Sequence, residues 1–376
     1  MKKIISILIV MTMLFLSCGM GVSAVGNNAG EDALRKQFKE GDYIYDYYYY
    51  SPVKGSTDKT KYPVILWLHG QLSGEFKGDQ VRESDVVYLA SDENQAKIKG
   101  TGGAYVLVPR HPAINTNASL AWVSENANIK KFVDKFIAEN KANIDTNRIY
   151  VGGYSMGGRA AIKFAASYSD FVAAAFPASS IYLLASADSD LKGLINTPTW
   201  FFTCKEDNFW GPPTPQSSDW NLLCGITNRK NDIRWTQFTR IDSKGTDVGL
   251  FNYDGSRIIM IGYNVHNVWD PVLHDLVMKS GSLYPNMTTV DGNNKVVNVT
   301  AENSFLSWLS SQSLNGVIED NGGNSGSGDN QGSTDSGNSG GANSGSSGKT
   351  FYHVRDILEF IISLFDRVYK ALFTVI

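Results

Sequence analysis

Ser155 is the residue whose surroundings most clearly suggest chemistry. It stands in Gly153-Tyr154-Ser155-Met156-Gly157, directly after the apolar β-type run 149–153 and before an alanine-rich helical pattern at 158–168. A strand, a sharp turn and a helix in this order strain the serine backbone and expose its Oγ at the top of a sheet. Gly153 and Gly157 suit such a turn because a Cβ there would collide where the two elements cross. The pattern therefore predicts that Ser155 is a nucleophile.

A serine hydroxyl needs a base within hydrogen-bond reach. In the fold typical of such a turn, the partners follow the serine in the order acid, then histidine. Of five histidines, two precede Ser155 and one lies near the carboxyl end of the chain, which leaves His266 and His274. We favour His266, because it follows the predicted strand 257–263, whereas His274 falls in a predicted helix.

The acid that orients the base should follow the predicted strand 198–203. Glu206 and Asp207 are the candidates there. We favour Asp207, whose shorter side chain suits the turn. Three other aspartates fit the expected topology less well: Asp188, Asp190 and Asp219.

Two backbone N–H groups are expected to stabilise a tetrahedral oxyanion. One is the N–H of Met156, the residue after the nucleophile. The other is assigned to Gln71, in the loop that follows the predicted strand 62–70. Gly70 lets that backbone approach a substrate, and His69 is expected to order the loop rather than to act as a base.

These motifs together resemble the α/β-hydrolase superfamily. The resemblance rests on Leu68-His69-Gly70, on the segment 147–158, on Asp207 and on His266-Asn267-Val268-Trp269-Asp270. Within the superfamily, the pattern is similar to secreted esterases of the polyhydroxybutyrate-depolymerase and feruloyl or acetyl-xylan esterase type, and to predicted peptidases. The histidine of those proteins lies in a comparable His-x-x-Trp-Asp segment. Cys204 departs from the pattern, because glycine is common there.

The resemblance spans about Tyr43 to Leu314 and implies a mostly parallel sheet with helices on both faces. Continuous apolar runs and helical spacings agree with that α/β fold class. We expect loops or lid helices over 209–235. The other expected elements are an exposed or edge strand in the tyrosine-rich segment 43–50, strands at 62–70, 104–109, 149–153, 171–176, 198–203 and 257–263, helices at 128–139, 158–168 and 303–314, and an added hairpin at 287–300.

The chain of 376 residues divides into four predicted segments. Residues 1–24 have the basic start, apolar stretch and small-residue cleavage site of a secretory signal. The hydrolase domain covers 30–316, and a Gly/Ser/Asn-rich linker covers 317–349. Residues 350–376 form an amphipathic helical pattern, which is expected to contact a membrane surface or a cell-envelope partner. The protein is therefore expected to be secreted and held at the cell surface through this helix; lipid anchoring at Cys18 is a weaker alternative.

Composition limits the partners. The formal net charge is −3, and no basic run is visible, which argues against a nucleic-acid partner. No metal or organic cofactor is expected.

Trp122 and Trp269 are candidate walls of a substrate pocket, and pairing of Cys204 with Cys224 is left open. The predicted activity is hydrolysis of carboxylic esters; a peptidase with the same residues and a surface binding module without catalysis are the alternatives.

Overall fold

The structure, a computed structural model, describes most of the predicted hydrolase domain. The described residues are 28–70, 85–111, 122–180, 192–207, 214–241, 244, 246, 248, 250–251, 253–258, 263–300, 302–316 and 318. The predicted signal segment, most of the linker and the predicted tail helix lie outside them. Within these ranges, no helix combines the length and the apolar character needed to cross a membrane.

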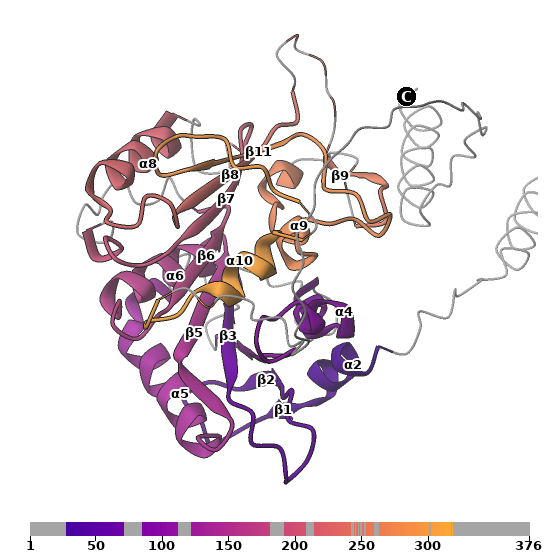
Figure 1. Ribbon diagram of the computed structural model, residues 1–376, viewed down its shortest axis with the longest axis vertical. Coiled ribbons are helices and arrows are strands. Elements are labelled where there is room, and N and C mark those ends of the chain that lie inside the picture. The colour runs from indigo at the N-terminus through magenta and orange to yellow at the C-terminus, as the bar shows by residue number, and fades with distance from the viewer. Residues whose placement is uncertain are drawn as a thin grey trace, which may run out of the picture.

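A nine-stranded sheet forms the centre of the domain (Figure 1). The six strands β4, β3, β5, β6, β7 and β8 are parallel to one another, and antiparallel strands complete both edges. In spatial order the strands are β1 (Phe38–Lys39), β2 (Tyr47–Tyr50), β4 (Tyr105–Pro109), β3 (Tyr62–Leu68), β5 (Ile144–Tyr154), β6 (Ala174–Ala178), β7 (Trp200–Cys204), β8 (Arg234–Phe238) and β11 (Met287–Asp291).

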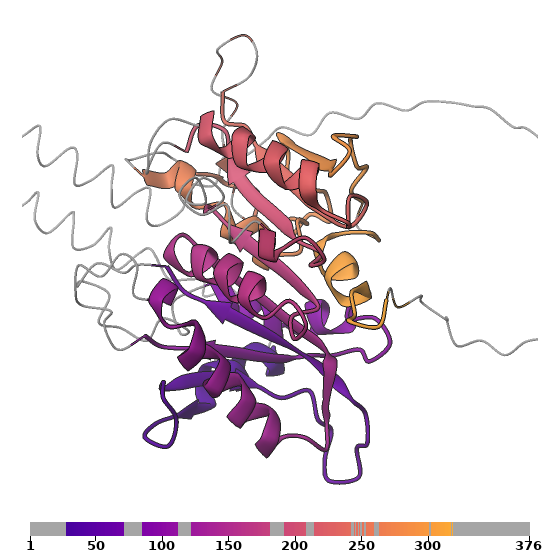
Figure 2. The ribbon, with the colours of Figure 1, turned by 90° about the vertical axis from the view of Figure 1, so that its left-hand side faces the viewer.

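Helices cover both faces of this sheet. One face carries α5 (Asn126–Glu139), α6 (Met156–Ser167) and α8 (Thr214–Ile226), which lie in front of the strands in Figure 2. The opposite face carries α2 (Ala29–Lys36), η1 (Asp85–Ala90), α4 (Asp92–Ala96), α9 (Trp269–Leu273) and α10 (Phe305–Ser311). Short 3₁₀ turns, η2 (Trp122–Ser124) and η4 (Tyr263–His266), and a two-stranded sheet of β9 (Leu250–Phe251) and β10 (Arg257–Ile258) complete the described elements.

The sheet separates two hydrophobic cores. Successive side chains of a strand point to opposite faces, so Leu66 and Leu68 of β3 join the core under α5 and α6, whereas Ile65 and Trp67 join the core under α9 and α10. Every residue of β3 is therefore buried, which explains its continuous apolar run.

The predicted order of elements is largely confirmed, with three corrections. The tyrosine-rich strand is second from the sheet edge, and Tyr47 and Tyr48 are buried in the two cores rather than exposed. The segment 209–235, predicted as loops or lid helices, contains all of α8, which packs on the sheet, and the start of the sheet strand β8. Of the predicted strand 257–263, the described residues are 257–258, which form β10 and pair with β9 outside the main sheet, and Tyr263, which begins η4.

The predicted hairpin at 287–300 is present, and its first strand extends the main sheet. β11 pairs antiparallel with β8, and a bridge between Val290 and Val296 closes the turn.

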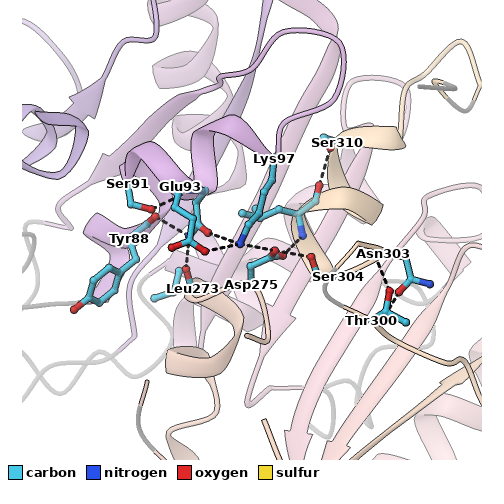
Figure 3. Close-up of polar contacts among 12 residues, drawn as sticks. Tyr88, Ser91, Glu93, Lys97, Leu273, Asp275, Thr300, Asn303, Ser304 and Ser310 are labelled. Atoms are coloured by element: carbon cyan, nitrogen blue, oxygen red, sulfur yellow. Dashed lines mark hydrogen bonds and ion pairs between the residues drawn. The ribbon is translucent and has the colours of Figure 1, made fainter. Parts of the chain in front are cut away.

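The segment after α9 is tied to α4 and α10 by one buried carboxylate (Figure 3). Asp275 is fully buried and accepts hydrogen bonds from the Ser304 hydroxyl and the Leu306 N–H at the start of α10. The Lys97 ammonium lies 3.2 Å from the same carboxylate. This network holds the loop that carries α9 against the body of the domain.

Candidate active site

Ser155 occupies a strained turn between β5 and α6. Its φ of 52° and ψ of −119° lie outside the ordinary regions for a residue with a side chain. A Cβ on Gly157 would lie 2.0 Å from the Leu68 carbonyl oxygen, and one on Gly153 would lie 2.4 Å from the same atom. The two glycines are therefore required by close backbone packing, as the sequence predicted. The Ser155 side chain makes no capping hydrogen bond to α6.

His266 and Asp207 are in direct contact. The His266 Nδ1 and Asp207 Oδ2 atoms are 2.7 Å apart, and both residues are buried. Asp207 lies in the turn after β7, where its N–H donates to the Cys204 carbonyl at 3.1 Å. His266 ends the turn η4. With a carboxylate accepting at Nδ1, the Nε2 atom is the one that can act as a base.

Glu206, the alternative acid, is engaged elsewhere. Its carboxylate accepts hydrogen bonds from the backbone N–H groups of Arg240 and Ile241, at 2.9 and 3.1 Å. Glu206 thus ties the turn after β7 to the segment that follows β8. The Cys204 thiol donates to the same carboxylate at 3.2 Å.

The end of β6 makes hydrogen bonds both to Ser155 and to His266, the partner of Asp207. The Ser155 N–H donates to the Ala178 carbonyl at 2.9 Å, and the hydroxyl of the next residue, Ser179, donates to the His266 carbonyl. Ser179 has a φ of 55° and its own N–H donates to Phe202 of β7 at 2.8 Å. The carboxyl ends of β5, β6 and β7 therefore position all three predicted residues.

Trp269 forms a second link between the serine turn and His266. Its indole stacks on the Tyr154 ring with centroids 4.1 Å apart, and it meets the His266 ring edge-on at 5.9 Å. Trp269 is only partly buried. Its position beside the serine turn is compatible with the predicted role in a pocket wall.

Trp122 lies in the core rather than on a pocket wall. Its indole is fully buried and packs edge-on against the rings of His69, His111 and Tyr45. A substrate has no surface of this side chain to contact, so its role here is packing.

His69 orders the loop after β3. Its Nδ1–H donates to the Gly70 carbonyl at 2.7 Å, and its Nε2 accepts the His111 N–H at 3.1 Å. Burial lowers the pKa of His69 to about 4, so the ring is neutral near pH 7 and cannot serve as a cationic group. A Cβ on Gly70 would lie 2.4 Å from the Tyr154 ring, so only glycine fits beside the serine turn.

The two predicted oxyanion donors differ in how far the structure describes them. Met156 begins α6, where the first N–H groups have no acceptor within the helix and the helix dipole favours negative charge. Gln71 lies outside the described residues, directly after Gly70.

His274, the alternative base, packs against two aromatic rings. It is buried at the end of α9, and its ring centroid lies 3.7 Å from that of Tyr88 and 3.9 Å from that of Tyr253. Its Nε2 lies 3.4 Å from Asp270 Oδ1.

Cys204 and Cys224 are both free and buried. Burial raises the pKa of the Cys224 thiol to about 11, and it raises the pKa of Cys204 as well. The pairing of these two cysteines, which the sequence left open, is not formed in the structure, and their raised pKa values favour the thiol over the thiolate.

Ser179 and Tyr154 are site residues that sequence reasoning missed. Ser179 holds the His266 carbonyl, and Tyr154 supports both Gly70 and Trp269. Tyr154 stands inside the glycine–serine motif and could have been considered for that reason. No local signal marks Ser179, because its role depends on the packing of η4 against β6.

A mostly parallel sheet with helices on both faces, and a serine at a strained strand-to-helix turn above it, define the α/β-hydrolase fold. The predicted fold class is therefore confirmed. This assignment rests on the strand order and the serine turn of the chain itself.

No protein-family profile matches the chain, and no curated protein matches it. Among solved structures, a thermostable esterase is similar at 18% identity and a TM-score of 0.46, over 74% of this chain and 64% of that one. The acylaminoacyl peptidase of Pyrococcus horikoshii is similar in two structures. Its orthorhombic form has 16% identity and a TM-score of 0.35, and its uncomplexed form has 17% and 0.33; each covers 50% of this chain and 34% of the peptidase. This chain thus spans less than two thirds of each of these proteins.

Proposed function

We propose that the protein is a serine hydrolase that cleaves carboxylic esters through an acyl-enzyme. The observation that carries this proposal is the 2.7 Å contact between His266 and Asp207 at the sheet edge where Ser155 is held in a strained turn. Ser155 and Asp207 lie at the ends of different strands. If this arrangement were only structural, the strained backbone conformation of Ser155 would not be needed.

In the proposed reaction, Ser155 Oγ attacks the ester carbonyl carbon while His266 Nε2 takes its proton. Asp207 holds the imidazole in the required tautomer and stabilises the imidazolium. His266 then gives the proton to the leaving alcohol, and water attacks the acyl-enzyme with His266 again acting as base. The backbone N–H groups of Met156 and Gln71 are the proposed donors to the oxyanion.

The substrate class is proposed from the resemblance stated above. Acyl groups on plant polysaccharides and polyester chains are the substrates to test first, and Trp269 is the proposed wall of the acyl or sugar pocket.

Secretion, with surface attachment through residues 350–376, is proposed on the sequence pattern alone. Deleting 349–376 should reduce the cell-associated fraction, and an unchanged fraction would contradict the attachment.

Ser155→Ala is the decisive test. The variant should lose at least about 10⁴-fold in kcat/KM on a short-chain aryl ester, and its melting temperature should match that of the wild type. A fluorophosphonate probe should label the wild type at Ser155 and not the variant. Activity of the variant within tenfold of wild type would refute the proposal, and failure of the probe to label the wild type would favour a binding module without catalysis.

Matched ester and amide substrates separate an esterase from a peptidase. The same residues can cleave both bonds, so the ratio of the two kcat/KM values decides. We expect the ratio of the ester kcat/KM to the amide kcat/KM to exceed the ratio of the uncatalysed hydrolysis rates of the two substrates. A peptide preferred over its matched ester would identify a peptidase.

A further inference from the structure

A second group of polar side chains lies close to the proposed site but takes no part in it. Asp85 of η1, Asp270 of α9 and His274 at the end of α9 each offer one ligand atom, and the three atoms lie within 4.8 Å of one another. Asp270 and His274 are four residues apart, so they share a helix face. Asp85 comes from a distant part of the sequence, so only the fold brings the three together.

The His274 ring is held with its edge toward the carboxylates. Tyr253 stacks on it with an interplanar angle of 8°, and the Tyr88 ring, tilted by 45°, has its centroid 3.7 Å from that of His274. The side chain is about 95% buried, with a relative exposure of 5%. Among the residues that the structure describes, its ring nitrogens have no hydrogen bond; Nε2 faces Asp270 Oδ1 at 3.4 Å. A buried imidazole fixed in this way has a free lone pair available for a cation.

The charges of the group also favour a cation. Two carboxylates meet in a buried place, where unpaired charge is costly. Arg35 of α2 acts on Asp85 electrostatically, and the Tyr284 hydroxyl donates to Asp270 Oδ2 at 3.2 Å. The Asp85 and Asp270 carboxyl groups also hydrogen-bond to each other, which requires a shared proton, and a bound cation would take the place of that proton.

We propose that Asp85, Asp270 and His274 bind one divalent transition-metal ion, of which Zn²⁺ fits best. Zn²⁺ takes imidazole nitrogen and carboxylate oxygen at about 2.0–2.2 Å in a tetrahedron, so its ligand atoms stand roughly 3.4 Å apart. The His274–Asp270 separation of 3.4 Å already has this value. Ca²⁺ and Mg²⁺ fit less well, because they require more oxygen ligands and do not favour imidazole.

The ion would serve as a clamp. It joins η1 to α9, and α9 begins three residues after His266. Metal binding would therefore hold the segment that carries Trp269 and the proposed base, without entering the reaction. This role goes beyond the proposed function and does not depend on it.

Direct metal binding to the purified, tag-free protein is the first test. After EDTA treatment and removal of the chelator, titration with ZnCl₂ should give one ion per chain by calorimetry and by elemental analysis, with a Kd below about 1 μM. Zinc in 100-fold excess over Kd should raise the melting temperature by at least about 3 °C. Less than 0.1 zinc per chain at 50 μM zinc, with an unchanged melting temperature, would overturn the proposal.

Variants then locate the ion. Asp85→Asn and His274→Gln should each weaken zinc binding at least 100-fold and abolish the zinc-dependent rise in melting temperature. Asp134→Asn removes an exposed carboxylate on α5, and His266→Ala removes the proposed base; both should bind zinc as the wild type does. If His266→Ala loses the ion while His274→Gln keeps it, zinc binds at the catalytic pair and the proposed clamp is wrong.

Discussion

The described part of the chain contains two buried His–Asp pairs, His266 with Asp207 and His274 with Asp270, whose histidines are eight residues apart. In the first pair the acid comes from the end of β7, and the 2.7 Å contact is a hydrogen bond. In the second pair the acid stands on the same helix, and the 3.4 Å contact is too open for a strong one.

The surroundings of the two histidines differ as much as their acids. His266 has its carbonyl fixed by Ser179 at the end of β6, beside the strand that presents Ser155. His274 packs against the rings of Tyr88 and Tyr253, and a second carboxylate, that of Asp85, has an oxygen within 4.8 Å. The comparison teaches that a buried imidazole with a carboxylate neighbour does not by itself identify a base: a base also needs one nitrogen oriented by the acid and the other directed at a nucleophile.

Replacing each of the two histidines by alanine should give the largest difference in activity between the two pairs. His266→Ala should lower kcat/KM on an aryl ester by at least about 10⁴-fold, because it removes the proposed base. His274→Ala should stay within tenfold of wild type. Steady-state kinetics on both variants, with circular dichroism to check folding, decide the matter. The opposite ranking would exchange the roles of the two pairs.

The two adjacent acids provide the next contrast. Asp207→Asn should reduce kcat by about 10³- to 10⁴-fold, because the amide stabilises the wrong tautomer of His266. Glu206→Gln should instead lower the free energy of unfolding by about 1–2 kcal/mol through its weakened bonds to Arg240 and Ile241. Kinetics and urea denaturation of both variants separate the effects. A large rate loss in Glu206→Gln alone would move the acid to that residue.

His69 extends the contrast to a histidine that is kept neutral. Its pKa is about 4 in the folded protein against an ordinary value of 6.5, so the unfolded chain binds more protons between these values. The contribution of the neutral His69 ring to the free energy of unfolding is therefore fully present above pH 6.5. It decreases by about 3 kcal/mol as the pH falls to 4. The difference in unfolding free energy between wild type and His69→Gln should shrink by that amount from pH 7 to pH 4. A constant difference would show that the ring is not held neutral.

The smallest expected effect concerns the support of His266. Ser179→Ala removes the donor to the buried His266 carbonyl and should cost about 1–2 kcal/mol of stability, with kcat reduced less than tenfold. Ser180→Ala is a matched control, since the Ser180 hydroxyl is buried and makes no hydrogen bond among the described residues. Thermal denaturation of both variants should show a loss only for Ser179→Ala; equal losses would mean that Ser179 has no special role.

Much of the fold was predictable because its signals are local. The buried strands β3, β4 and β5 show continuous apolar runs, and α5 has a clear helical spacing. β8 was missed because a strand near the sheet edge, with Trp, Thr and Gln in its interior, lacks such a run. The described start of the strand expected before His266, residues 257–258, pairs with β9 in a separate sheet, because a short β-type segment does not specify which sheet it joins.

The sequence by itself determined the serine turn, its glycines and the order of an acid and a histidine behind it, because these depend on backbone geometry over a few residues. Only the tertiary structure decided that Asp207 rather than Glu206 faces His266, that Trp122 is core, and that Asp85 meets Asp270 and His274. The physical reason is that contacts between side chains far apart in the chain depend on which strands and helices pack side by side. Local patterns of residues do not encode that arrangement.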